Sequence, residues 1–341
     1  MVEGLFRDRT ILITGGTGTI GREVATQVLA YQPAAVRIYS RDESKQFDMQ
    51  QEFSHDPGLR YFIGDVRDKE RLLLAMEDVD IVFHTAALKH VGACEYNPFE
   101  AVKTNIYGTQ NVIDAALAKN VRKVILTSSD KAVNPVNTMG VSKLMAEKLI
   151  TAANQYKGKK RTIFASVRFG NVLGSRGSVL PLIKEQIKRG GPVTLTHPEM
   201  TRFVLALSEA VRLLFQATAM ARGGEVFVLK MPVIRVADLM SVMVEDLAPV
   251  MGHDPAAVKI NIIGAKPGEK LYEELITDEE RTRTVLKDGM YVILPAAEGA
   301  ASVGARRKAR QSAFSDVLVS NETACLSNPE IRSYLYERNL I

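Results

Sequence analysis

The sequence predicts an α/β protein with a doubly wound parallel sheet and a smaller C-terminal lobe. Up to about residue 175, short apolar segments alternate with amphipathic ones, which is the pattern of a parallel sheet with helical crossovers. The first apolar segment, residues 10–14, leads directly into a glycine-rich turn and a helical pattern, the order found in Rossmann dinucleotide-binding folds. We therefore expect residues 1–175 to form a Rossmann domain, with some later segments returning to it. Residues 176–341 are expected to form mainly the smaller lobe and a C-terminal tail.

The composition is that of an ordinary globular protein. Of the 341 residues, 46% are hydrophobic and 24% are charged, and the net charge is +5. The short basic cluster at 306–310 contains no aromatic residue, so nucleic acid is not an expected partner. Cys94 and Cys325 lack metal-ligand spacing, as do the five histidines, which favours a reduced, cytoplasmic setting without a metal site. The first residues show no signal-peptide pattern, and no apolar run reaches the roughly 18 residues of a membrane span, so no membrane partner is expected.

The glycine-rich turn after the first strand predicts a dinucleotide site. Gly15, Gly18 and Gly21 form a GxxGxxG pattern, and a helical pattern follows at residues 24–29. These glycines permit a tight turn, close approach of a pyrophosphate and close packing of the helix on the strand. The helix N-terminus adds backbone amides and a partial positive charge for the pyrophosphate. The alternative is a glycine turn with a purely structural role.

The end of the second strand bears on the choice between NADP and NAD. Ser40 and Arg41 follow the strand at 36–39, and Lys45 is close in sequence. NAD sites usually place an acidic residue there for the ribose hydroxyls, whereas a serine and two cations suit the 2′-phosphate of NADP. NADP is therefore favoured. Asp42 keeps NAD open, and the alternative for Arg41 is a solvated surface charge.

Two further segments carry candidate cofactor contacts. The third strand, at 60–66, contains Asp65 near its end, where an aspartate often accepts a hydrogen bond from the adenine amine, and a helix capped by Asp68 follows. The long helical pattern at 101–119 contains Asn105. That side chain either forms a hydrogen bond across the site or is a buried asparagine with satisfied polar groups.

The loop after the fourth strand is expected to face the ligands. The strand ends at His84, which we expect to be structural rather than catalytic. Ala86 and Ala87 are small enough to let a cofactor lie against the backbone. Lys89 and His90 lie on the part of the loop that should face the substrate.

The fifth strand, at 123–127, leads into the stretch with the richest chemistry. Asp130 and Lys131 follow the strand end, where open α/β sheets bind ligands. Met139 and Lys143 lie four residues apart at a helix start, which is the Tyr-x-x-x-Lys spacing of short-chain dehydrogenases with Met in place of Tyr. Methionine cannot transfer a proton. Either the chain is not an enzyme or another group does that work, and Asp130 and Lys131 are the candidates.

Shorter elements follow the sixth strand at 162–168. The loop at 169–179 is rich in glycine and small polar residues and is suited to gripping a sugar nucleotide. Arg202 is a candidate phosphate clamp, with a surface charge as the alternative, and the turn at 266–271 is expected at the nucleotide. Helices are expected at 181–189, 236–247 and 332–336, strands at 193–196, 223–230 and 259–263, and a mobile low-complexity loop at 296–309.

Motifs spread over the chain carry a family resemblance. They are the stretches at 15–21, 40–43, 64–68, 86–91, 100–105, 129–132, 170–172, 175–179, 200–203 and 267–270. Together they resemble the UDP-N-acetylglucosamine 4,6-dehydratases, extended short-chain dehydrogenases of the polysaccharide-biosynthesis group. The resemblance covers about residues 5–280 and is most specific at Ser129–Asp130–Lys131 and at Met200–Thr201–Arg202–Phe203.

The resemblance implies a tightly bound NADP, recycled in each turnover, and UDP-N-acetylglucosamine as substrate. Cofactor contacts are then expected from Gly15, Thr17, Gly18, Thr19, Ile20, Gly21, Ser40, Arg41, Lys45, Asp65, Val66, Ala86, Ala87, Lys89, Asn105, Thr127 and Lys143. Substrate contacts are expected from Lys89, His90, Asn171, Ser178, Val179, Arg202 and Glu269.

The implied reaction moves a hydride from C4 of the sugar to the cofactor and back to C6, with loss of water. By resemblance, Asp130 is the acid at the C6 hydroxyl and Lys131 the base at C5, while Ser129 bonds the C4 oxygen and Lys143 the nicotinamide ribose. Met139 is the departure from the pattern, and it leaves the C4 base unassigned. Our hypothesis is that Asp130, directly or through water, takes that proton. Retention at C5 is favoured over inversion.

Two rival functions remain open at this stage. A nucleotide-sugar 4-epimerase needs hydride transfer only at C4, so the Asp130–Lys131 pair would be surplus. A non-catalytic NADP or sugar-nucleotide sensor is suggested by Met139. A UDP-sugar is favoured over a GDP-sugar, and a homo-oligomer, either a dimer or a hexamer, is expected by resemblance.

Overall fold

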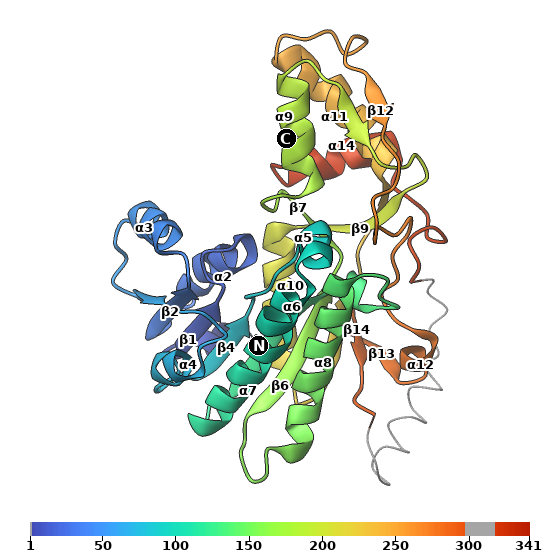
Figure 1. Ribbon diagram of the computed structural model, residues 1–341. Coiled ribbons are helices and arrows are strands. Elements are labelled where there is room, and N and C mark those ends of the chain that lie inside the picture. The colour runs from blue at the N-terminus through green and yellow to red at the C-terminus, as the bar shows by residue number, and fades with distance from the viewer. Residues whose placement is uncertain (1, 297–317) are drawn as a thin grey trace. The chain divides into compact units, whose positions relative to one another are not determined.

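The structure, a computed structural model, describes residues 2–296 and 318–341. Within these residues the chain forms two compact units (Figure 1). The first contains the chain up to Phe169, Val211–Leu229 and residues 277–296, and the second contains Gly170–Ala210, Lys230–Ile276 and residues 318–341. The division expected at residue 175 stays a prediction. The basic cluster at 306–310 and the low-complexity loop beyond residue 296 lie outside the described residues.

In the described part of the first unit, nine strands form one sheet in the order β13-β14-β10-β6-β5-β4-β1-β2-β3. The strands are β1 Thr10–Thr14, β2 Ala35–Ser40, β3 Leu59–Ile63, β4 Ile81–His84, β5 Lys123–Ser129, β6 Ile163–Phe169, β10 Val226–Leu229, β13 Thr284–Lys287 and β14 Met290–Ile293. Neighbours from β3 to β10 are parallel, and β14 and β13 are added antiparallel. The chain order reverses between β1 and β4, which is the switch point where doubly wound sheets bind ligands. The predicted fold class is confirmed.

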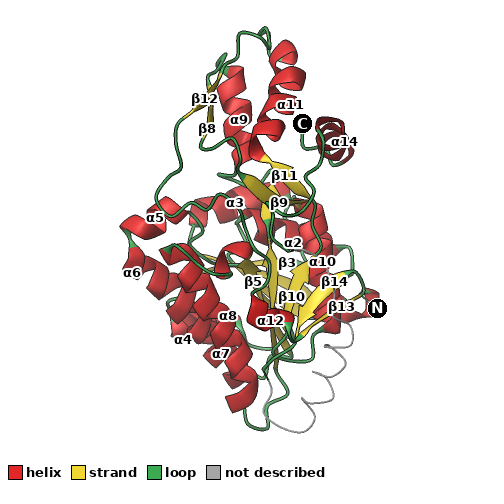
Figure 2. Cartoon of the chain, turned by 90° about the vertical axis from the view of Figure 1, so that its right-hand side faces the viewer, coloured by secondary structure: helices red, strands yellow, loops and turns green. Residues whose placement is uncertain are grey.

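Helices cover both faces of this sheet. They are α1 Glu3–Phe6, α2 Thr19–Leu29, α3 Glu43–Glu52, α4 Lys69–Ala75, α5 Val91–Tyr96, α6 Pro98–Ala101, the π-helix η1 Val102–Tyr107, α7 Gly108–Ala118, the 3₁₀ turn η2 Asp130–Ala132, α8 Thr138–Tyr156, α10 Leu207–Met220 and α12 Asp278–Arg281. Helices α4, α7 and α8 lie on one face, and α2 and α10 on the other (Figure 2). The Asp68 cap predicted for α4 is present, since its carboxylate accepts from Arg71 N at 2.9 Å.

Apolar packing holds both faces. On the α4, α7 and α8 face, a buried cluster includes Leu72, Val112, Ile113, Ile150 and Val124. On the other face, the rings of Phe6 and Phe83 pack against Phe215 of α10, with centroids 4.7 and 5.6 Å from it. Burial of this apolar surface stabilises the packing of the helices on both faces of the sheet.

The second unit is smaller. Its elements are β7 Asn171–Leu173, α9 Val179–Lys188, β8 Val193–Leu195, β9 Thr201–Ala206, β11 Val233–Arg235, α11 Val236–Val250, β12 Ile260–Ile262 and α14 Asn328–Glu337. Strand β9 is central, antiparallel to β11 and parallel to β7, and β12 pairs with β8.

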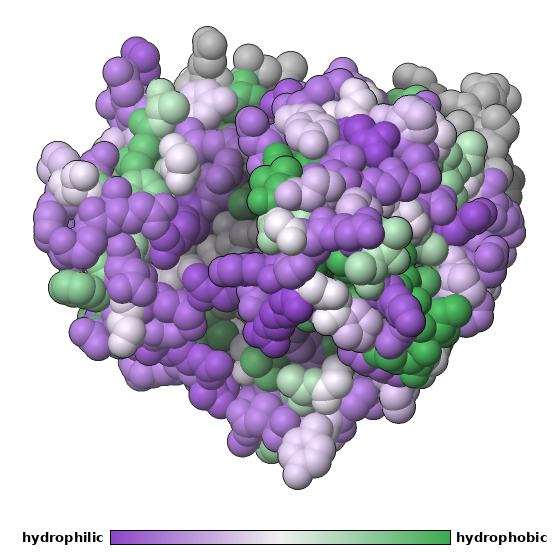
Figure 3. All heavy atoms as spheres, turned by 90° about the horizontal axis from the view of Figure 1, so that it is seen from above, coloured by the Kyte–Doolittle hydropathy of each residue, from purple (hydrophilic) through white to green (hydrophobic). Residues whose placement is uncertain are grey.

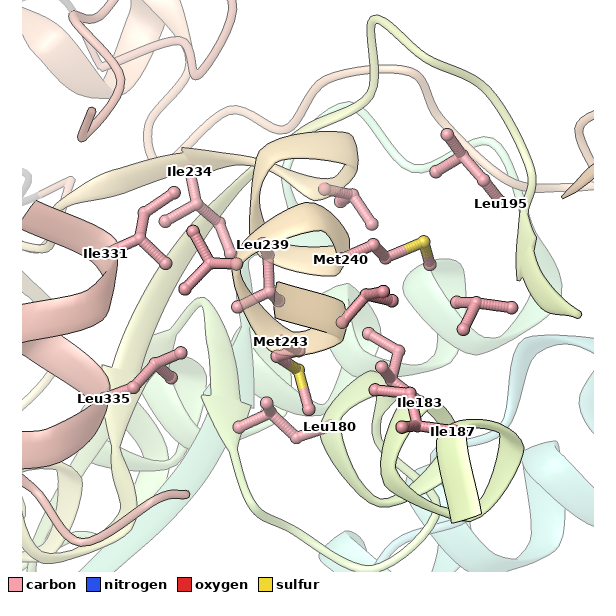
Figure 4. Close-up of a cluster of buried hydrophobic side chains, with 14 of the residues drawn as sticks. Leu180, Ile183, Ile187, Leu195, Ile234, Leu239, Met240, Met243, Ile331 and Leu335 are labelled. Carbon is pink, nitrogen blue, oxygen red and sulfur yellow. The ribbon is translucent and has the colours of Figure 1, made fainter. Parts of the chain in front are cut away.

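Three helices of the second unit meet in one apolar core. Figure 4 shows Leu180, Ile183 and Ile187 of α9 facing Leu239, Met240 and Met243 of α11, and the same buried cluster contains Ile331 and Leu335 of α14. The C-terminal helix therefore belongs to the core of this unit.

Helices α11 and α14 are longer than the predicted 236–247 and 332–336, and two other differences have a physical reason. Helix α9 begins at Val179, before the predicted start at Pro181, because proline is tolerated within the first turn of a helix. The helical pattern at 101–119 contains the π-helix η1, which an α-helical periodicity does not reveal.

Seen from above, the surface is mostly hydrophilic, with smaller apolar patches between polar ones (Figure 3). None of the helices in residues 2–296 and 318–341 combines the length and the apolar character needed to cross a bilayer.

Candidate functional site

Asp130 is the buried centre of the site at the end of β5. Its side chain is 0% exposed, and its Oδ1 accepts hydrogen bonds from Ser129 Oγ at 2.7 Å, Lys131 N at 2.8 Å and Lys131 Nζ at 3.1 Å. Its Oδ2 is buried without a hydrogen-bond donor in the described part of the chain. The structure thus brings together Ser129, Asp130 and Lys131, the three residues predicted to carry the chemistry. A buried oxygen with no donor is suited to exchanging a proton with a ligand.

The start of α8 is packed directly against this turn. Asn137 caps the helix by accepting from Gly140 N at 2.8 Å. A Cβ on Gly140 would lie 2.2 Å from the backbone oxygen of Lys131, so only glycine allows this approach. Gly140 therefore allows the backbone of Lys131 to pack directly against the first turn of α8, which contains Met139. The sequence pattern does not single out Gly140, because one glycine in a helical pattern carries no signal of close approach.

Gly140→Ala is expected to lower the free energy of unfolding by about 1–3 kcal/mol, the usual cost of overpacking. Turnover should fall as well, because the added methyl displaces the backbone of Lys131. Urea denaturation and initial rates measure the two effects. Gly92→Ala is the control, since a Cβ there meets nothing within 4 Å. Equal stability and rates in the two variants would contradict the role given to Gly140.

Met139 is an apolar packing residue in this structure. It is 4% exposed and lies in a cluster with Cys94 and Ala101, against which Leu88 and Val91 pack. Met139 lies in the first turn of α8, four residues before Lys143, and its surroundings are apolar. The thioether adds no proton-transfer group to the site.

Lys143 is buried one turn further along α8. Its Nζ donates to Thr127 O at 2.6 Å, and the side chain is 7% exposed. Burial lowers the pKa of Lys143 to about 8, against the opposing effect of Glu147. Thr127, a predicted cofactor contact, is buried and its hydroxyl donates to His84 O at 3.3 Å.

Stability should depend on pH through Lys143. Its folded pKa of about 8 lies below the ordinary lysine value of 10.5, so between these values the unfolded chain binds more protons than the folded one. Stability therefore rises with pH in this window, by at most about 1.4 kcal/mol per pH unit. We expect the unfolding free energy of the wild type, relative to Lys143→Met, to increase from pH 8 to 10. A flat or falling difference in urea denaturation would contradict this.

The glycine turn forms a closed backbone cradle. A Cβ on Gly15 would lie 2.8 Å from the Cα of Ala86, and one on Gly21 would lie 2.6 Å from Gly15 O. Helix α2 begins at Thr19 and Ile20 with Gly18 as its N-cap and no side-chain cap. An N-terminus without a side-chain cap, at the end of a glycine turn, fits a pyrophosphate.

The end of β2 presents a serine where many NAD sites have an acid. Ser40 Oγ bonds Thr17 Oγ1 at 2.8 Å, which ties the strand end to the glycine turn. Asp42 caps α3 by accepting from Lys45 N at 3.0 Å, and its carboxylate also pairs with Lys45 Nζ. Arg41 is exposed. The Asp42 carboxylate is thereby engaged locally, in a cap and an ion pair.

Other predicted cofactor residues line the neighbouring strand ends. Asp65 pairs with Arg67 at 2.7 Å and Arg41 at 3.8 Å, and these contacts lower the pKa of Asp65 against the effect of its burial. Val66 is buried in the core beside α7. Ala87 is half-buried on the loop after β4.

Asn105 shapes the same loop. Its amide oxygen accepts from Leu88 N at 2.8 Å, and its Nδ2 donates to Leu88 O at 3.0 Å. It is therefore a buried, satisfied asparagine that holds the loop, which was one of the two predicted readings. Lys89 and His90 follow on the exposed part of the loop.

The predicted substrate residues of the second unit come from several of its elements. Asn171 begins β7, Ser178 is the N-cap of α9 and Val179 is its first residue. Arg202 is 6% exposed and donates to the backbone oxygens of Thr201, Lys270 and Leu271 at 2.8, 2.7 and 3.2 Å. Glu269 lies 4.0 Å from its guanidinium. The surface-charge alternative for Arg202 is wrong, and the phosphate role stays a prediction.

One buried ion cluster went unpredicted. Arg168 at the end of β6 is 0% exposed and donates to Glu147 of α8 at 2.7 and 3.2 Å and to Glu280 of α12 at 3.1 Å. Burial opposes its charge, but the two glutamates raise the pKa of Arg168 above its ordinary value. In the described residues, no three His, Cys, Asp or Glu side chains are grouped to hold a metal ion.

Comparison with known proteins places these features in a family. Residues 11–295 match the family model described as "Polysaccharide biosynthesis protein". An uncharacterized membrane protein of Methanocaldococcus jannaschii is 55% identical, over 86% of this chain and 88% of its own length. A UDP-N-acetylglucosamine 4,6-dehydratase (inverting) of Campylobacter jejuni is 46% identical, over 85% of this chain and 84% of its own. A UDP-glucose 4-epimerase of Rickettsia canadensis is 42% identical, over 82% and 81%.

Solved structures give the same result for the fold. The structure of Pen from Bacillus thuringiensis matches with a TM-score of 0.92 and 45% identity, over 98% of this chain and 99% of that one. A dTDP-glucose 4,6-dehydratase of Streptomyces venezuelae, solved with NAD, matches with a TM-score of 0.70 and 21% identity, over 88% and 96%. At that identity the second match speaks for the fold alone.

Proposed function

Because the chain belongs to the polysaccharide biosynthesis protein family, we propose that it is a hydro-lyase, a nucleotide-sugar 4,6-dehydratase acting on UDP-N-acetylglucosamine. Its product would be a UDP-2-acetamido-2,6-dideoxy-hexos-4-ulose. The observation that carries this proposal is the Asp130–Lys131 pair, with 3.1 Å between Asp130 Oδ1 and Lys131 Nζ, at the carboxyl end of β5. The Campylobacter relative, named for this reaction, supports it.

The pair suits an elimination across two adjacent carbons. Loss of water needs a base at C5 and an acid at the C6 hydroxyl, and Lys131 and Asp130 are close enough to serve neighbouring atoms. Met139 cannot take the proton of the C4 hydroxyl, so we assign that step to Asp130 Oδ2. One carboxyl group then takes a proton at C4 and delivers it at C6. Ser129 is assigned to the C4 oxygen and Lys143 to the cofactor ribose.

A nicotinamide dinucleotide bound at the glycine turn would supply the hydride acceptor for C4 and the hydride donor for C6. Gly15, Gly18 and the start of α2 would hold its pyrophosphate. We propose NADP rather than NAD. Arg41 is exposed and its pairing with Asp65 is long, at 3.8 Å, so its guanidinium can turn to a 2′-phosphate, whereas the Asp42 carboxylate is engaged by Lys45 and by its cap.

Arg41→Ala is expected to weaken NADP binding by roughly tenfold or more, the loss of a charge-assisted contact of about 1.5–3 kcal/mol. NAD binding should change little, because NAD lacks the 2′-phosphate. Titration of the cofactor-free protein with each nucleotide measures both affinities. Lys69→Ala is the control, since Lys69 is an exposed cation paired with Asp114. Equal losses for NADP and NAD would contradict the assignment of Arg41.

The outcome at C5 has support in both directions. The runs at 40–47 and 96–99 resemble those of family members that retain the configuration at C5, whereas the Campylobacter relative is named as inverting. The Campylobacter relative is 46% identical over 85% of the chain, so we propose inversion at C5.

The second candidate is a 4-epimerase, which the name of the Rickettsia relative supports. Epimerisation at C4 needs no base at C5 and no acid at C6, so it does not account for the Asp130–Lys131 pair. A non-catalytic sensor is the third reading, because Met139 lacks proton-transfer chemistry.

Proton NMR of the purified protein with UDP-N-acetylglucosamine in D2O, without added cofactor, tests the proposal. A new C6 methyl signal with deuterium at C5 is the expected result. The couplings of H5 from a parallel run in H2O distinguish inversion from retention. Inversion at C4 without a methyl signal would indicate an epimerase. No change with UDP- or GDP-sugars, with NADP confirmed in the protein, would indicate a sensor.

A further inference from the structure

We propose that His84, with its ring proton on Nε2, is a positioning residue that couples the glycine turn to the segment holding Leu88 and the start of α8. The inference rests on the proposed function only in taking these segments to be the ones that hold the nicotinamide cofactor. From the sequence, His84 is expected to be a structural residue at a strand end.

His84 is the last residue of β4 and is 1% exposed. Its Nδ1 lies 2.7 Å from Thr14 Oγ1, and its Nε2 lies 3.1 Å from Thr109 Oγ1. Thr14 is the last residue of β1, and Thr109 lies in the first turn of α7. The imidazole thus bridges one central strand to a helix packed over the sheet.

The partners fix the tautomer. The Thr109 hydroxyl donates its single proton to Asn105 O at 2.7 Å, so toward His84 it can only accept. Nε2 therefore carries the ring proton. Burial, helped by the charge of Lys143, lowers the pKa of His84 to about 3, so the ring is neutral and Nδ1 accepts from Thr14 Oγ1. The chain of hydrogen bonds has one direction, from Thr14 through His84 and Thr109 to Asn105.

One end of this chain sets the cofactor cradle. Thr14 precedes Gly15, and its Oγ1 accepts from Ala86 N at 3.5 Å. The Thr85 hydroxyl donates to Thr14 O at 2.7 Å. Because Ala86 Cα would be only 2.8 Å from a Cβ on Gly15, a shift of either backbone alters the cradle.

The other end sets the loop after β4 and the start of α8. Asn105, in the π-helix η1, bonds both backbone groups of Leu88. Its Nδ2 also donates to Ser142 Oγ at 2.8 Å, and Ser142 in turn donates to Met139 O at 2.7 Å. The hydrogen bond from Thr109 to the Asn105 carbonyl therefore links His84 to the contacts that Asn105 makes with Leu88 and Ser142. π-Helical turns often occur at functional sites, which agrees with this placement.

A histidine that only stabilises the core would show the same burial. A positioning role predicts something more. Removing the Thr109 hydroxyl, which interrupts the series of hydrogen bonds at a residue expected to touch no ligand, should weaken cofactor binding. Thr218 offers a matched control. It is 0% exposed in α10, and its hydroxyl donates to the backbone oxygen four residues earlier, Leu214 O, at 2.7 Å, as Thr109 does to Asn105.

The experiment compares Thr109→Val, Thr109→Ser and Thr218→Val in the full chain. Each cofactor-free protein is titrated with NADPH by fluorescence, thermal unfolding is followed, and the His84 ring nitrogens are read by NMR in 15N-histidine-labelled protein. We expect the Nε2–H tautomer in the wild type from pH 6 to 8. Thr109→Val should raise the NADPH dissociation constant at least tenfold and change the ring-nitrogen shifts. Thr109→Ser should restore both, and Thr218→Val should lose thermal stability without losing affinity.

Two results would overturn the inference. One is an NADPH affinity in Thr109→Val equal to that of Thr218→Val. The other is a His84 ring that carries its proton on Nδ1 or titrates between pH 5 and 8. Failure of the dehydratase proposal has a different signature, which is normal NADPH binding and the expected tautomer without any C6 methyl product.

Discussion

Asp130→Asn is expected to lower dehydratase turnover by roughly a thousandfold, within the range typical for loss of an acid–base group. The amide has nearly the shape of the carboxyl, so its oxygen can still accept from Ser129 Oγ and Lys131 N. It cannot take the C4 proton or protonate the C6 hydroxyl. Initial rates of methyl formation, followed by NMR, measure the effect, and NADPH binding should persist.

Asp114→Asn is the matched control, because Asp114 is a partly exposed carboxylate paired with Lys69 on the helical face. Its turnover should equal that of the wild type. The reduction of bound cofactor by substrate tests the C4 step alone, through the near-ultraviolet absorbance of the reduced nicotinamide. If Asp130→Asn reduced the cofactor at the wild-type rate, Asp130 would not be the C4 base.

Arg168→Met is expected to destabilise the fold by about 3–5 kcal/mol, the usual cost of removing one partner of a buried ion pair. The substitution leaves the carboxylates of Glu147 and Glu280 buried without their cation. Since domains are typically stable by about 5–15 kcal/mol, the variant should unfold at much lower urea concentration than the wild type. Circular dichroism during urea titration measures this loss.

Glu280→Gln separates the charge of the cluster from its hydrogen bonds. An amide can still accept from Arg168, and the remaining Glu147–Arg168 pair is neutral overall. We expect a much smaller loss of stability than in Arg168→Met. Equal losses in the two variants would mean that packing or capping of α12, rather than the buried charge, accounts for the effect.

Local sequence patterns were sufficient to predict the strands of the large sheet and the residues at the ends of these strands. The run 124–126 is apolar and is followed at once by small polar and charged residues, so the burial of β5 and the placement of Asp130 and Lys131 after it could be predicted. Likewise, the order of strand, glycine turn and helix predicted the tight turn at Gly15 and the helix that begins after Gly18.

Contacts between distant segments could not be predicted from one sequence. The apolar cluster around Met139 depends on Cys94 and Ala101, which belong to two other helices. In the sequence, Arg168 is an ordinary cation at a strand end. Only the fold brings Glu280, which is far along the chain, into contact with it. The π-helix around Asn105 differs from an α-helix in its hydrogen bonding rather than in its apolar spacing.

The order of strands in the sheet has a consequence for synthesis of the chain on the ribosome. Strand β6 is followed by Gly170–Ala210 of the second unit, and its neighbour β10 is made only after that segment. In a chain that has emerged from the ribosome only to residue 175, β6 is therefore an open edge, and Arg168 has Glu147 but not yet Glu280. The cofactor-binding sheet reaches its described form only after β14 is made. A fragment ending at residue 175 should therefore aggregate through that edge when expressed alone.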